Sequence, residues 1–233
     1  MATLKRSGVA DVESGPRTAT YTVGAAMSVS LDGFVAGPKD GRGQPLGKGG
    51  ERLFDWYFKG DTPSRHGGGR FHLSAISAQV FDQRVDRTAA VVCGRRTYDI
   101  ANGWGGKGPL EGVPLVILSH RAPAEVPRAD IPYTFVTEGI AGAVEQARSA
   151  AARCGKGRTV MLMGGEIIRA GLAAGLLDEL ELDLVPVVLG GGVPLFRGPE
   201  PVSFEVLRVI EAAGVTHLHY RVLKPGSIPQ VRL

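Results

Sequence analysis

The sequence predicts an α/β domain with a central, mostly parallel sheet, flanking helices and an antiparallel hairpin at its C-terminal end. Two observations predict this class. From residue 74 onward, short apolar runs alternate with segments of helical spacing, which is typical of βα units in a parallel sheet. Near the end of the chain, the alternating stretches 204–210 and 216–223 flank the short segment 211–215, as in an antiparallel hairpin.

Length and charge favour a single domain that does not bind nucleic acid. With 233 residues and 43% hydrophobic content, the chain is long enough to bury a large core. Residues 1–19 are polar and lack periodicity, so we expect a disordered leader before one domain over residues 20–233. The net charge is +4, but the 27 basic and 23 acidic residues are spread along the chain without runs of like charge. No nucleic-acid partner is therefore expected.

The cysteines and the hydropathy of the sequence indicate its cellular compartment and whether it binds a metal. Cys93 and Cys154 are the two cysteines, and their spacing argues against a disulfide framework or a zinc site and fits a reducing cytosol. The sequence has neither a signal-peptide core nor a run of about 18 apolar residues, so no membrane partner is expected. It therefore predicts a cytoplasmic protein without a bound metal.

The first third of the chain predicts one long strand and two irregular insertions. Residues 21–30 are strand-like and run into a turn-rich loop at 31–38. The segments 38–50 and 59–70 are rich in glycine and charge. Between them, residues 51–58 have the spacing of one or two helical turns.

Helices and strands then alternate. The expected helices with apolar residues at helical spacing are 74–86, 140–153 and a segment that opens with Glu166. A further helix is expected to start at residues 94–99. The expected strands are short apolar or alternating runs, and they are 89–93, 115–118, 134–136, 160–163 and 180–184. Residues 186–189 lead into three glycines at 190–192, which predict a loop or a bulge.

Three expected strand ends carry residues suited to phosphate binding. They are Gly94-Arg95-Arg96-Thr97, Ser119-His120-Arg121 and Gly164-Gly165-Glu166. Each alone also fits a plain turn, a solvated arginine or a helix cap. In an open α/β sheet, however, ligands bind outside the carboxyl ends of the strands, where such turns converge. Their hydroxyls, guanidinium groups and helix-start amides together suit a dinucleotide with a 2′-phosphate.

The common nucleotide-binding motifs are missing. No G-x-G-x-x-G follows the first expected strand, and no G-x-x-x-x-G-K-[ST] loop occurs. The sequence therefore supports neither an ordinary Rossmann domain nor a P-loop NTPase.

Four motifs resemble, in order, those of the dihydrofolate reductase fold, and in particular those of the RibD C-terminal reductase-like family. They are SLDGFVA at 30–36, GRRTY at 94–98, LSHR at 118–121 and MGG at 163–165. The resemblance covers roughly residues 21–224 and is more specific for fold and cofactor than for substrate. It implies a dihydrofolate reductase-like sheet with NADPH across its carboxyl edge.

The resemblance also implies which residues hold NADPH. The residues expected at the cofactor phosphates are Gly94, Arg95, Arg96 and Thr97, and those around the 2′-phosphate are Ser119, His120 and Arg121. Gly164 and Gly165 match the family's glycine pair, whose connecting peptide is typically cis, and Glu166 and Ile167 follow on the same turn. Ala26 and Ala36 belong to the segments that would line the nicotinamide.

The proton donor is harder to identify. Reduction of a C=N bond needs a proton at nitrogen as hydride reaches carbon, and a partly buried carboxyl group or a water that it orients can supply it. Asp32 matches the aspartate of the family's S-L-D-G element, although Asp-Gly is also an ordinary turn pair. Asp55 and Trp56 lie where a substrate-facing helix is expected, although they also fit a solvated and a core position. We expect these three residues to contact substrate and one of the aspartates to assist catalysis.

Two remaining groups of ionisable residues are interpreted as structural. His217 and His219 share one face of a strand, where a polar sheet face is favoured over a metal site. The acidic residues expected to be solvated are Asp178, Glu179, Glu181 and Asp183. The H-x-E and P-C-x-x-C elements of a zinc deaminase are absent, so no deaminase half is expected.

The sequence thus predicts an NADPH-dependent reductase that acts on a pteridine-like, pyrimidine-like or related heterocyclic substrate. Two alternative enzymes are the 5-amino-6-(5-phosphoribosylamino)uracil reductase of riboflavin biosynthesis and dihydrofolate reductase. A non-catalytic NADPH-binding protein is the alternative from another class. The family resemblance and the exposed edge of a terminal hairpin also predict a homodimer.

Overall fold

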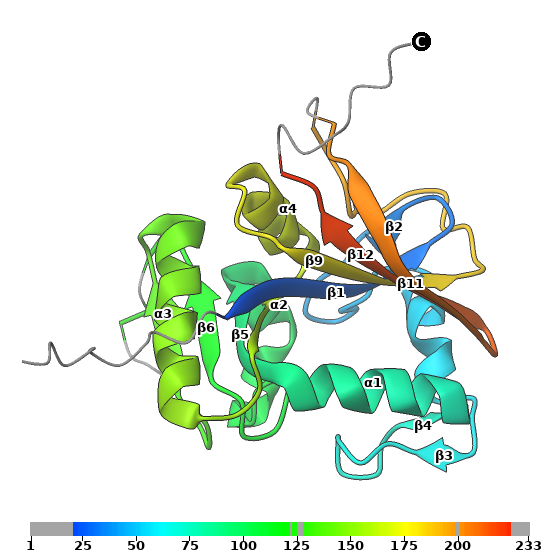
Figure 1. Cartoon of the computed structure of the whole chain (residues 1–233), viewed down its shortest axis with the longest axis horizontal. Coiled ribbons are helices and arrows are strands. Elements are labelled where there is room, and N and C mark those ends of the chain that lie inside the picture. The colour runs from blue at the N-terminus through cyan, green and yellow to red at the C-terminus, as the bar shows by residue number, and fades with distance from the viewer. Residues whose placement is uncertain (1–20, 122, 125–127, 199–200, 225–233) are drawn as a thin grey trace, which may run out of the picture.

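The computed structural model describes residues 21–121, 123–124, 128–198 and 201–224. Its main feature is an eight-stranded sheet with the order β11-β12-β9-β1-β8-β5-β6-β7 (Figure 1). The strands are β1 (Thr22–Ser30), β5 (Thr88–Gly94), β6 (Leu115–Leu118), β7 (Tyr133–Val136), β8 (Thr159–Met163), β9 (Glu179–Val185), β11 (Phe204–Ala212) and β12 (Val215–Val222). The expected leader at residues 1–19 lies outside the described residues.

The pairing of the strands confirms the predicted mostly parallel sheet. β1 is central and pairs in parallel with both β8 and β9, and β5, β6 and β7 continue the parallel part. β12 is antiparallel to β9 and to β11, which gives the predicted terminal hairpin. The buried strand β5 has almost no exposed side chain, as its continuous apolar run predicts.

Helices cover both faces of the sheet. The helix α3 (Gly139–Cys154) and the helix α4 (Gly165–Ala173) pack on one face, over apolar side chains that include Val23 and Ala25 of β1. The other face carries α1 (Ala75–Arg87) and the 3-10 helix η1 (Gly50–Tyr57), whose core includes Leu53 and Trp56. Figure 1 shows α1 below β1 and α4 above it.

Local sequence signals explain where the helices begin and end. The Ser74 hydroxyl accepts a hydrogen bond from the Ser77 amide at 3.2 Å and caps α1, which was expected to begin at residue 74. Gly155, with φ 69°, ends α3 in the left-handed conformation that a glycine adopts without strain. The predicted helices and strands are therefore confirmed, with boundaries that shift by one or two residues.

Several short elements escape the sequence patterns. They are β2 (Phe34–Ala36) with its antiparallel partner β10 (Val193–Pro194), β3 (Thr62–Pro63) with β4 (His72–Leu73), and the 3-10 segment η2 (Asn102–Gly106). The short helix α2 (Arg95–Ile100), in contrast, begins where the sequence predicts a helix start. Strands of two or three residues are too short to show a period of two, so alternation does not reveal them. The β2–β10 pair matters most, because it closes the loop after β1 against the segment after β9.

One expectation about the backbone is wrong. The peptide between Gly164 and Gly165 is trans, as is every peptide bond in the described part of the chain. Gly164 instead has φ 94° and ψ 141°, a conformation that favours glycine. The turn between β8 and α4 therefore obtains its shape from the φ angle of Gly164.

Among the helices that the structure describes, none has the length and apolar character that crossing a membrane requires.

Candidate functional site

The turns after β5 and β8 meet at the carboxyl edge of the sheet. A Cβ built on Gly164 would lie 2.8 Å from Thr97 Oγ1, so only a residue without a side chain fits there unstrained. On the same side, Gly94 faces Ile167, whose Cγ1 would be 3.4 Å from a Cβ at residue 94. Two of the three predicted strand-end motifs therefore lie against each other, as expected for adjacent parallel strands.

The start of α4 presents unpaired amides at this edge. The N-cap residue is Gly164, which offers no side chain to the first turn of the helix. The first helical hydrogen bond runs from the Ile168 amide to the Gly164 carbonyl at 3.0 Å, so the preceding amides have no partner within the helix. Glu166 points its charge away from the core as an exposed residue. The nine-residue helix can thus contribute amides and the positive end of its dipole to an anion.

The third motif closes a tight turn beside the first. The Ser119 hydroxyl donates to the Arg121 carbonyl at 2.7 Å and accepts from the Arg121 amide at 3.3 Å. This local ring leaves His120 and Arg121 exposed. Because Leu118 is in register with Gly94 on the neighbouring strand, the turn lies next to the start of α2. All three predicted motifs therefore meet at one edge.

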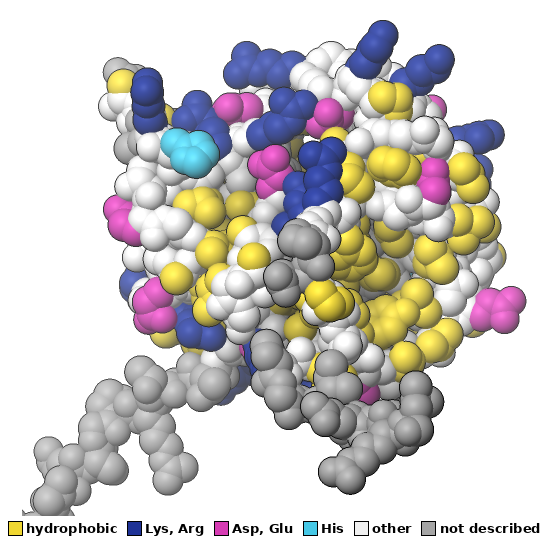
Figure 2. All heavy atoms as spheres, turned by 90° about the horizontal axis from the view of Figure 1, so that it is seen from above, with side chains coloured by type: hydrophobic (Ala, Val, Ile, Leu, Met, Phe, Trp, Pro, Cys, Tyr) yellow, Lys and Arg dark blue, Asp and Glu magenta, His cyan; other side chains and the backbone are white. Residues whose placement is uncertain are grey.

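The two arginines of α2 already have partners. Arg95 Nε donates to both carboxylate oxygens of Asp99 at 3.0 Å, one helical turn away. Arg96 donates to the Asp40 carbonyl at 2.9 Å and pairs with its carboxylate at 3.0 Å. This second contact ties the glycine-rich segment 38–50 to the site. Figure 2 shows Lys and Arg side chains gathered in its upper part, on the face seen from above.

The residues expected at the nicotinamide lie close to the same edge. Ala36 is buried in β2, and Val35 beside it approaches Gly165, at 3.5 Å from a Cβ built there. Ala26 lies on β1, in register with Glu181 of β9, and packs in the core under α2. The structure therefore brings the loop after β1 to the β8–α4 turn.

Asp32 anchors a loop in this structure. Its carboxylate accepts the amides of Leu189 at 3.1 Å and of Gly190 at 2.7 Å, and the side chain is exposed. Hydrogen bonds from the Ser30 side chain and from these amides lower the pKa of Asp32 below its ordinary value of 3.8. Asp32 is thus a carboxylate at neutral pH, and it holds the three glycines at 190–192 against the loop after β1.

Asp55 and Trp56 are neighbours in η1 that point in different directions. The Asp55 carboxylate pairs with Lys59, and 45% of its side chain is exposed. Trp56 is buried and donates its indole N–H to the Ser28 hydroxyl at 3.2 Å. Trp56 therefore covers the end of β1, whereas Asp55 faces solvent.

The largest error of the sequence interpretation concerns the acidic residues of β9. Glu181 and Asp183, which were expected to be solvated, are buried, with 7% and 1% of their surface exposed. They face α1, where Arg84 donates to Asp183 at 2.8 and 2.9 Å and to Glu181 at 3.0 Å. Glu181 also pairs with Arg87. A carboxylate without partners would be costly here, and these arginines compensate it.

His217 belongs to the same buried group. Its Nδ1 lies 2.7 Å from Asp183 Oδ1, and its Nε2 lies 3.0 Å from Ser77 Oγ. Burial alone would raise the pKa of Asp183, but the Arg84 charge and the hydrogen bonds from Arg84 and His217 outweigh it and lower the pKa to about 2. His219 pairs with Glu179 at 3.0 Å, nearer the surface. The strand alternation correctly placed both histidines on a polar sheet face, but nothing in it revealed that α1 covers His217.

The site thus has two parts. The carboxyl edge combines close backbone approach, helix-start amides, a hydroxyl at Thr97 and basic side chains, which suits a phosphorylated ligand. Behind the end of β1, the second part is a buried set of residues that donate and accept protons, covered by Trp56. A phosphorylated ligand and a buried group of proton donors and acceptors can therefore be held by neighbouring parts of one sheet.

Comparison with known proteins supports this architecture. A family model described as the RibD C-terminal domain matches residues 21–222. Among solved structures, a protein assigned provisionally to riboflavin biosynthesis, from Shewanella sp. PV-4, is 23% identical with a TM-score of 0.62, and the match covers 87% of this chain and 99% of that one. No curated protein matches the sequence.

Two more distant structures share the fold. RibD from Acinetobacter baumannii is 15% identical with a TM-score of 0.56, and the match covers 89% of this chain and 59% of that longer one. Dihydrofolate reductase from Enterococcus faecalis, in a complex with NADP(H), is 12% identical with a TM-score of 0.52 over 87% of this chain and 97% of that one. At these identities, the likeness establishes a dihydrofolate reductase-like fold.

Proposed function

Because the chain belongs to the RibD C-terminal domain family, we propose that it is an NADPH-dependent reductase that transfers hydride to a pteridine-like or pyrimidine-like heterocycle. The family match and the convergence of three phosphate-type turns at one sheet edge support this activity. Two specific reactions are candidates for this reductase activity: reduction of 5-amino-6-(5-phosphoribosylamino)uracil and reduction of dihydrofolate.

The observation that carries the proposal is the contact between Gly164 and Thr97. A Cβ at Gly164 would come within 2.8 Å of the Thr97 hydroxyl oxygen, so the glycine lets this hydroxyl approach the head of α4 closely. A hydroxyl beside helix-start amides suits a pyrophosphate. The residues of this chain therefore fit the cofactor that the family implies.

Each group at the edge would have a separate role toward NADPH. Thr97 and the first-turn amides of α4 would bind the pyrophosphate, together with Arg95. Ser119, His120 and Arg121 would surround the 2′-phosphate, where the exposed Arg121 guanidinium would form charge-assisted hydrogen bonds. Arg96 would join them after exchanging Asp40 for phosphate. Ala26 and Ala36 would line the nicotinamide.

When bound, NADPH would supply the hydride, and the chain would place the substrate, exclude water and deliver a proton. The β2–β10 pair and the loop that Asp32 anchors would close over the end of β1. Asp32, Asp55 and Trp56 remain proposed substrate contacts. Trp56 is the best placed of the three, because its indole already covers Ser28.

Cofactor binding is tested first. Purified protein is titrated with NADPH and with NADH by following the quenching of tryptophan fluorescence. We expect NADPH to bind at least tenfold more tightly than NADH, because a 2′-phosphate held by arginine contributes about 1.5–3 kcal/mol. Equal affinity for both cofactors would count against the roles given to Ser119, His120 and Arg121.

Turnover is tested next, by following NADPH absorbance with dihydrofolate and with 5-amino-6-(5-phosphoribosylamino)uracil. Oxidation of NADPH that depends on one of these substrates would support the reductase and identify its form. Tight NADPH binding without turnover of either would favour the alternative, a non-catalytic NADPH-binding protein.

We also propose that two copies of the chain associate through the exposed hairpin. β11 is an edge strand of nine residues, and Val206 and Val209 on it are each 59% exposed. Figure 2 shows hydrophobic side chains across the right half of its view, the side on which the β11–β12 hairpin lies in Figure 1. A long apolar edge strand is a template for pairing with another strand, and a second copy offers the same edge.

A further inference from the structure

The proposed reductase still needs a proton donor, and both carboxylates expected from the sequence are engaged elsewhere. Asp32 accepts two loop amides and has a lowered pKa, which keeps it ionised. Asp55 pairs with Lys59 at the surface. Neither side chain is placed as a buried carboxylic acid that could donate a proton at neutral pH.

A buried array behind the end of β1 has the chemistry that these aspartates lack. Ser77 Oγ, the His217 imidazole and the Asp183 carboxylate form a continuous chain of hydrogen bonds, with lengths of 3.0 and 2.7 Å. All three residues are at most 4% exposed. They come from α1, β12 and β9, so three separate elements have to pack correctly to build the chain. We call these residues the Ser77–His217–Asp183 array.

Strand register places the array directly beside the proposed site. Ser28 of β1 is in register with Asp183 of β9, and Asp183 is in register with His217 of β12. The three residues form one row across the sheet on the face that α1 covers. Trp56 lies over this row, with its indole N–H on Ser28 and its ring centroid 5.2 Å from that of His217.

The charges in the array allow His217 to carry a proton. Arg84 fixes Asp183 as a carboxylate, since it binds both oxygens and is itself buried. The carboxylate can therefore accept the Nδ1–H of His217 and stabilise an imidazolium without taking the proton itself. Nε2 of His217 then exchanges its proton with the Ser77 hydroxyl.

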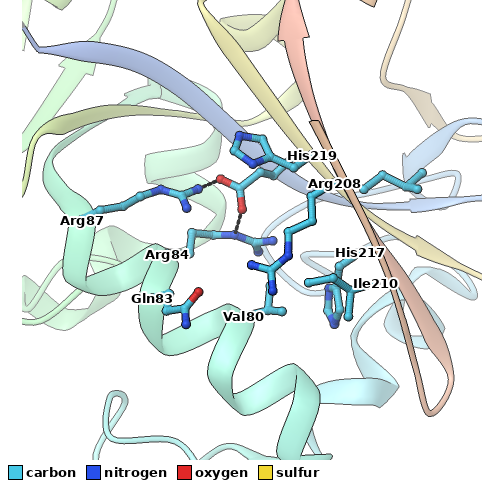
Figure 3. Close-up of a pocket in the computed structure, with 10 residues that line it drawn as sticks. Val80, Gln83, Arg84, Arg87, Arg208, Ile210, His217 and His219 are labelled. Atoms are coloured by element: carbon cyan, nitrogen blue, oxygen red, sulfur yellow. Dashed lines mark hydrogen bonds and ion pairs between the residues drawn. The ribbon is translucent and has the colours of Figure 1, made fainter. Parts of the chain in front are cut away.

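The array lies between the carboxyl edge of the sheet and a surface recess. α1 leads directly into the first strand residue of β5, so its C-terminal end lies at the amino edge of the sheet and its first turn, with Ser77, lies toward the carboxyl edge. On the opposite side, the His217 ring borders a recess with room for about 40 Å³ of water (Figure 3). Both ring nitrogens of His217 are held inside the array, by Ser77 and by Asp183, so the array exchanges protons with the site through its Ser77 end.

We propose that the Ser77–His217–Asp183 array is the proton source of the reductase. The inference rests on the proposed function. A substrate ring enters over Ser28 as the Trp56 indole moves aside and packs against it, and its C=N nitrogen reaches the Ser77 hydroxyl. Carbon accepts the hydride and its electron pair from the dihydronicotinamide, the C=N π pair moves to nitrogen, and nitrogen takes the Ser77 proton. The Nε2 proton of His217 passes to Ser77 in the same step, and after the product leaves, water in its place returns a proton to Nε2 through the Ser77 hydroxyl. Ser77 would touch the substrate, whereas His217 and Asp183 act through it.

Other titratable or charged groups face His217 from each element around it. They are Tyr57 of η1, Arg84 and Arg87 of α1, Glu181 and Asp183 of β9, Arg208 of β11 and His219 of its own strand. Asp183 is the one among them within hydrogen-bond distance of the imidazole in the described structure. Its negative charge therefore dominates the environment of His217.

The test compares His217→Asn with the matched control His219→Asn, two residues along the same strand. Both variants and Ser77→Ala are assayed with NADPH and whichever of dihydrofolate or 5-amino-6-(5-phosphoribosylamino)uracil the wild-type protein reduces. We expect His217→Asn and Ser77→Ala to lower kcat about 100-fold or more, the usual range for loss of a general acid, with NADPH affinity unchanged within about twofold. We also expect His217→Asn to remove a step from the pH profile of kcat and to change the solvent isotope effect.

His219→Asn should leave kcat, its pH profile and the isotope effect unchanged, because His219 contacts Glu179 rather than the array. If His217→Asn keeps the wild-type pH profile and isotope effect, the array is structural and the inference is wrong, while the proposed function stands. If the wild-type protein turns over neither substrate, the reductase proposal and this inference fall together. Urea unfolding of each variant shows whether a lowered kcat merely reflects a loss of folded protein.

Discussion

Arg84 holds both carboxylate oxygens of Asp183, at 2.8 and 2.9 Å, although the two residues are 99 positions apart in the sequence. The pair joins α1 to β9 in a part of the molecule where neither charge reaches solvent. Burial alone would lower the pKa of Arg84, but the charge of Asp183 raises it above its ordinary value. The two groups are therefore both ionised, and each depends on the other.

Removing one partner of this pair should destabilise the fold. We expect Arg84→Met to lower the free energy of unfolding by about 3–5 kcal/mol, because it leaves the Asp183 charge buried without compensation. Arg221→Met breaks the exposed pair with Glu205, at 2.6 Å, and should lower it by no more than about 1 kcal/mol. Urea unfolding measures both. Equal effects of the two variants would show that Asp183 finds another partner.

Acid should remove the stabilisation that Asp183 provides. Its pKa is about 2 in the folded protein and 3.8 in the unfolded reference, so the contribution is complete above about pH 4 and is lost as the pH falls toward 2. The expected loss is on the order of 2 kcal/mol. The double variant Arg84→Met, Asp183→Asn, which has neither charge, should show a shallower decline of stability across this window by urea unfolding at each pH. A parallel decline would mean that other carboxylates account for the effect.

Gly164→Ala tests the close approach of Thr97 to the head of α4. The new Cβ would strain a residue with φ 94° and press on Thr97 Oγ1, so we expect a loss of about 1–3 kcal/mol in stability and at least tenfold in NADPH affinity. Gly139→Ala serves as the control, because Gly139 also has a positive φ, 78°, but faces open space. Thermal unfolding and cofactor titration of both variants separate backbone strain from the clash. Unchanged NADPH affinity in Gly164→Ala would remove this turn from the cofactor site.

Arg121→Ala should change the choice of cofactor. We expect NADPH affinity to fall about 10- to 100-fold and NADH affinity to stay the same, because the guanidinium would contact only the 2′-phosphate. Arg153→Ala, which removes an exposed arginine from the last turn of α3, should affect neither cofactor. Fluorescence titration with both cofactors gives the ratio of NADPH affinity to NADH affinity for each variant. A parallel loss of NADPH and NADH affinity in Arg121→Ala would place this side chain elsewhere on the cofactor.

Charges on the edge strand β11 should prevent the proposed dimer from forming. The wild-type protein is expected to have the mass of a dimer by light scattering at micromolar concentration, and Val206→Lys with Val209→Lys to have that of a monomer, because lysines on an edge strand oppose pairing. Val188→Lys adds a charge at a residue that is 66% exposed outside the hairpin, and should leave the mass unchanged. A monomeric wild-type protein would refute the proposal.

The sequence predicts the strands and helices well because their patterns are local. The apolar run of β5 and the alternation of β12 indicate strands without knowledge of what packs on them. The same alternation misled the interpretation of Asp183. Acidic residues that alternate with leucines usually face water, and the partner that makes burial possible, Arg84, lies on a distant helix with an unremarkable pattern.

In the candidate site, too, local features could be predicted and contacts between distant residues could not. Three motifs correctly predicted which turns meet at the carboxyl edge, because each turn carries its own glycines and polar groups. The contacts between elements could not be predicted. The hydrogen bond from Trp56 to Ser28 and the ion pair of Arg96 with Asp40 depend on how loops of irregular sequence fold over the sheet. Asp32 was chosen from its S-L-D-G element and Asp55 from its place in an expected substrate-facing helix, but the structure gives both carboxylates contacts outside a buried acid site.

The central position of β1 makes folding depend on the far end of the chain. This strand is the first that the structure describes, yet its neighbours are β8 and β9, so Thr22 pairs with Thr159 and Gly24 with Glu179. During synthesis, β1 leaves the ribosome without either partner and has to wait until residue 185 has emerged. Sheets dominated by such long-range contacts fold slowly, because a large loop must close before any pairing is gained. Truncation before β9 would therefore remove β9, β12 and β11 together and leave β1 as an edge strand, unpaired on that side.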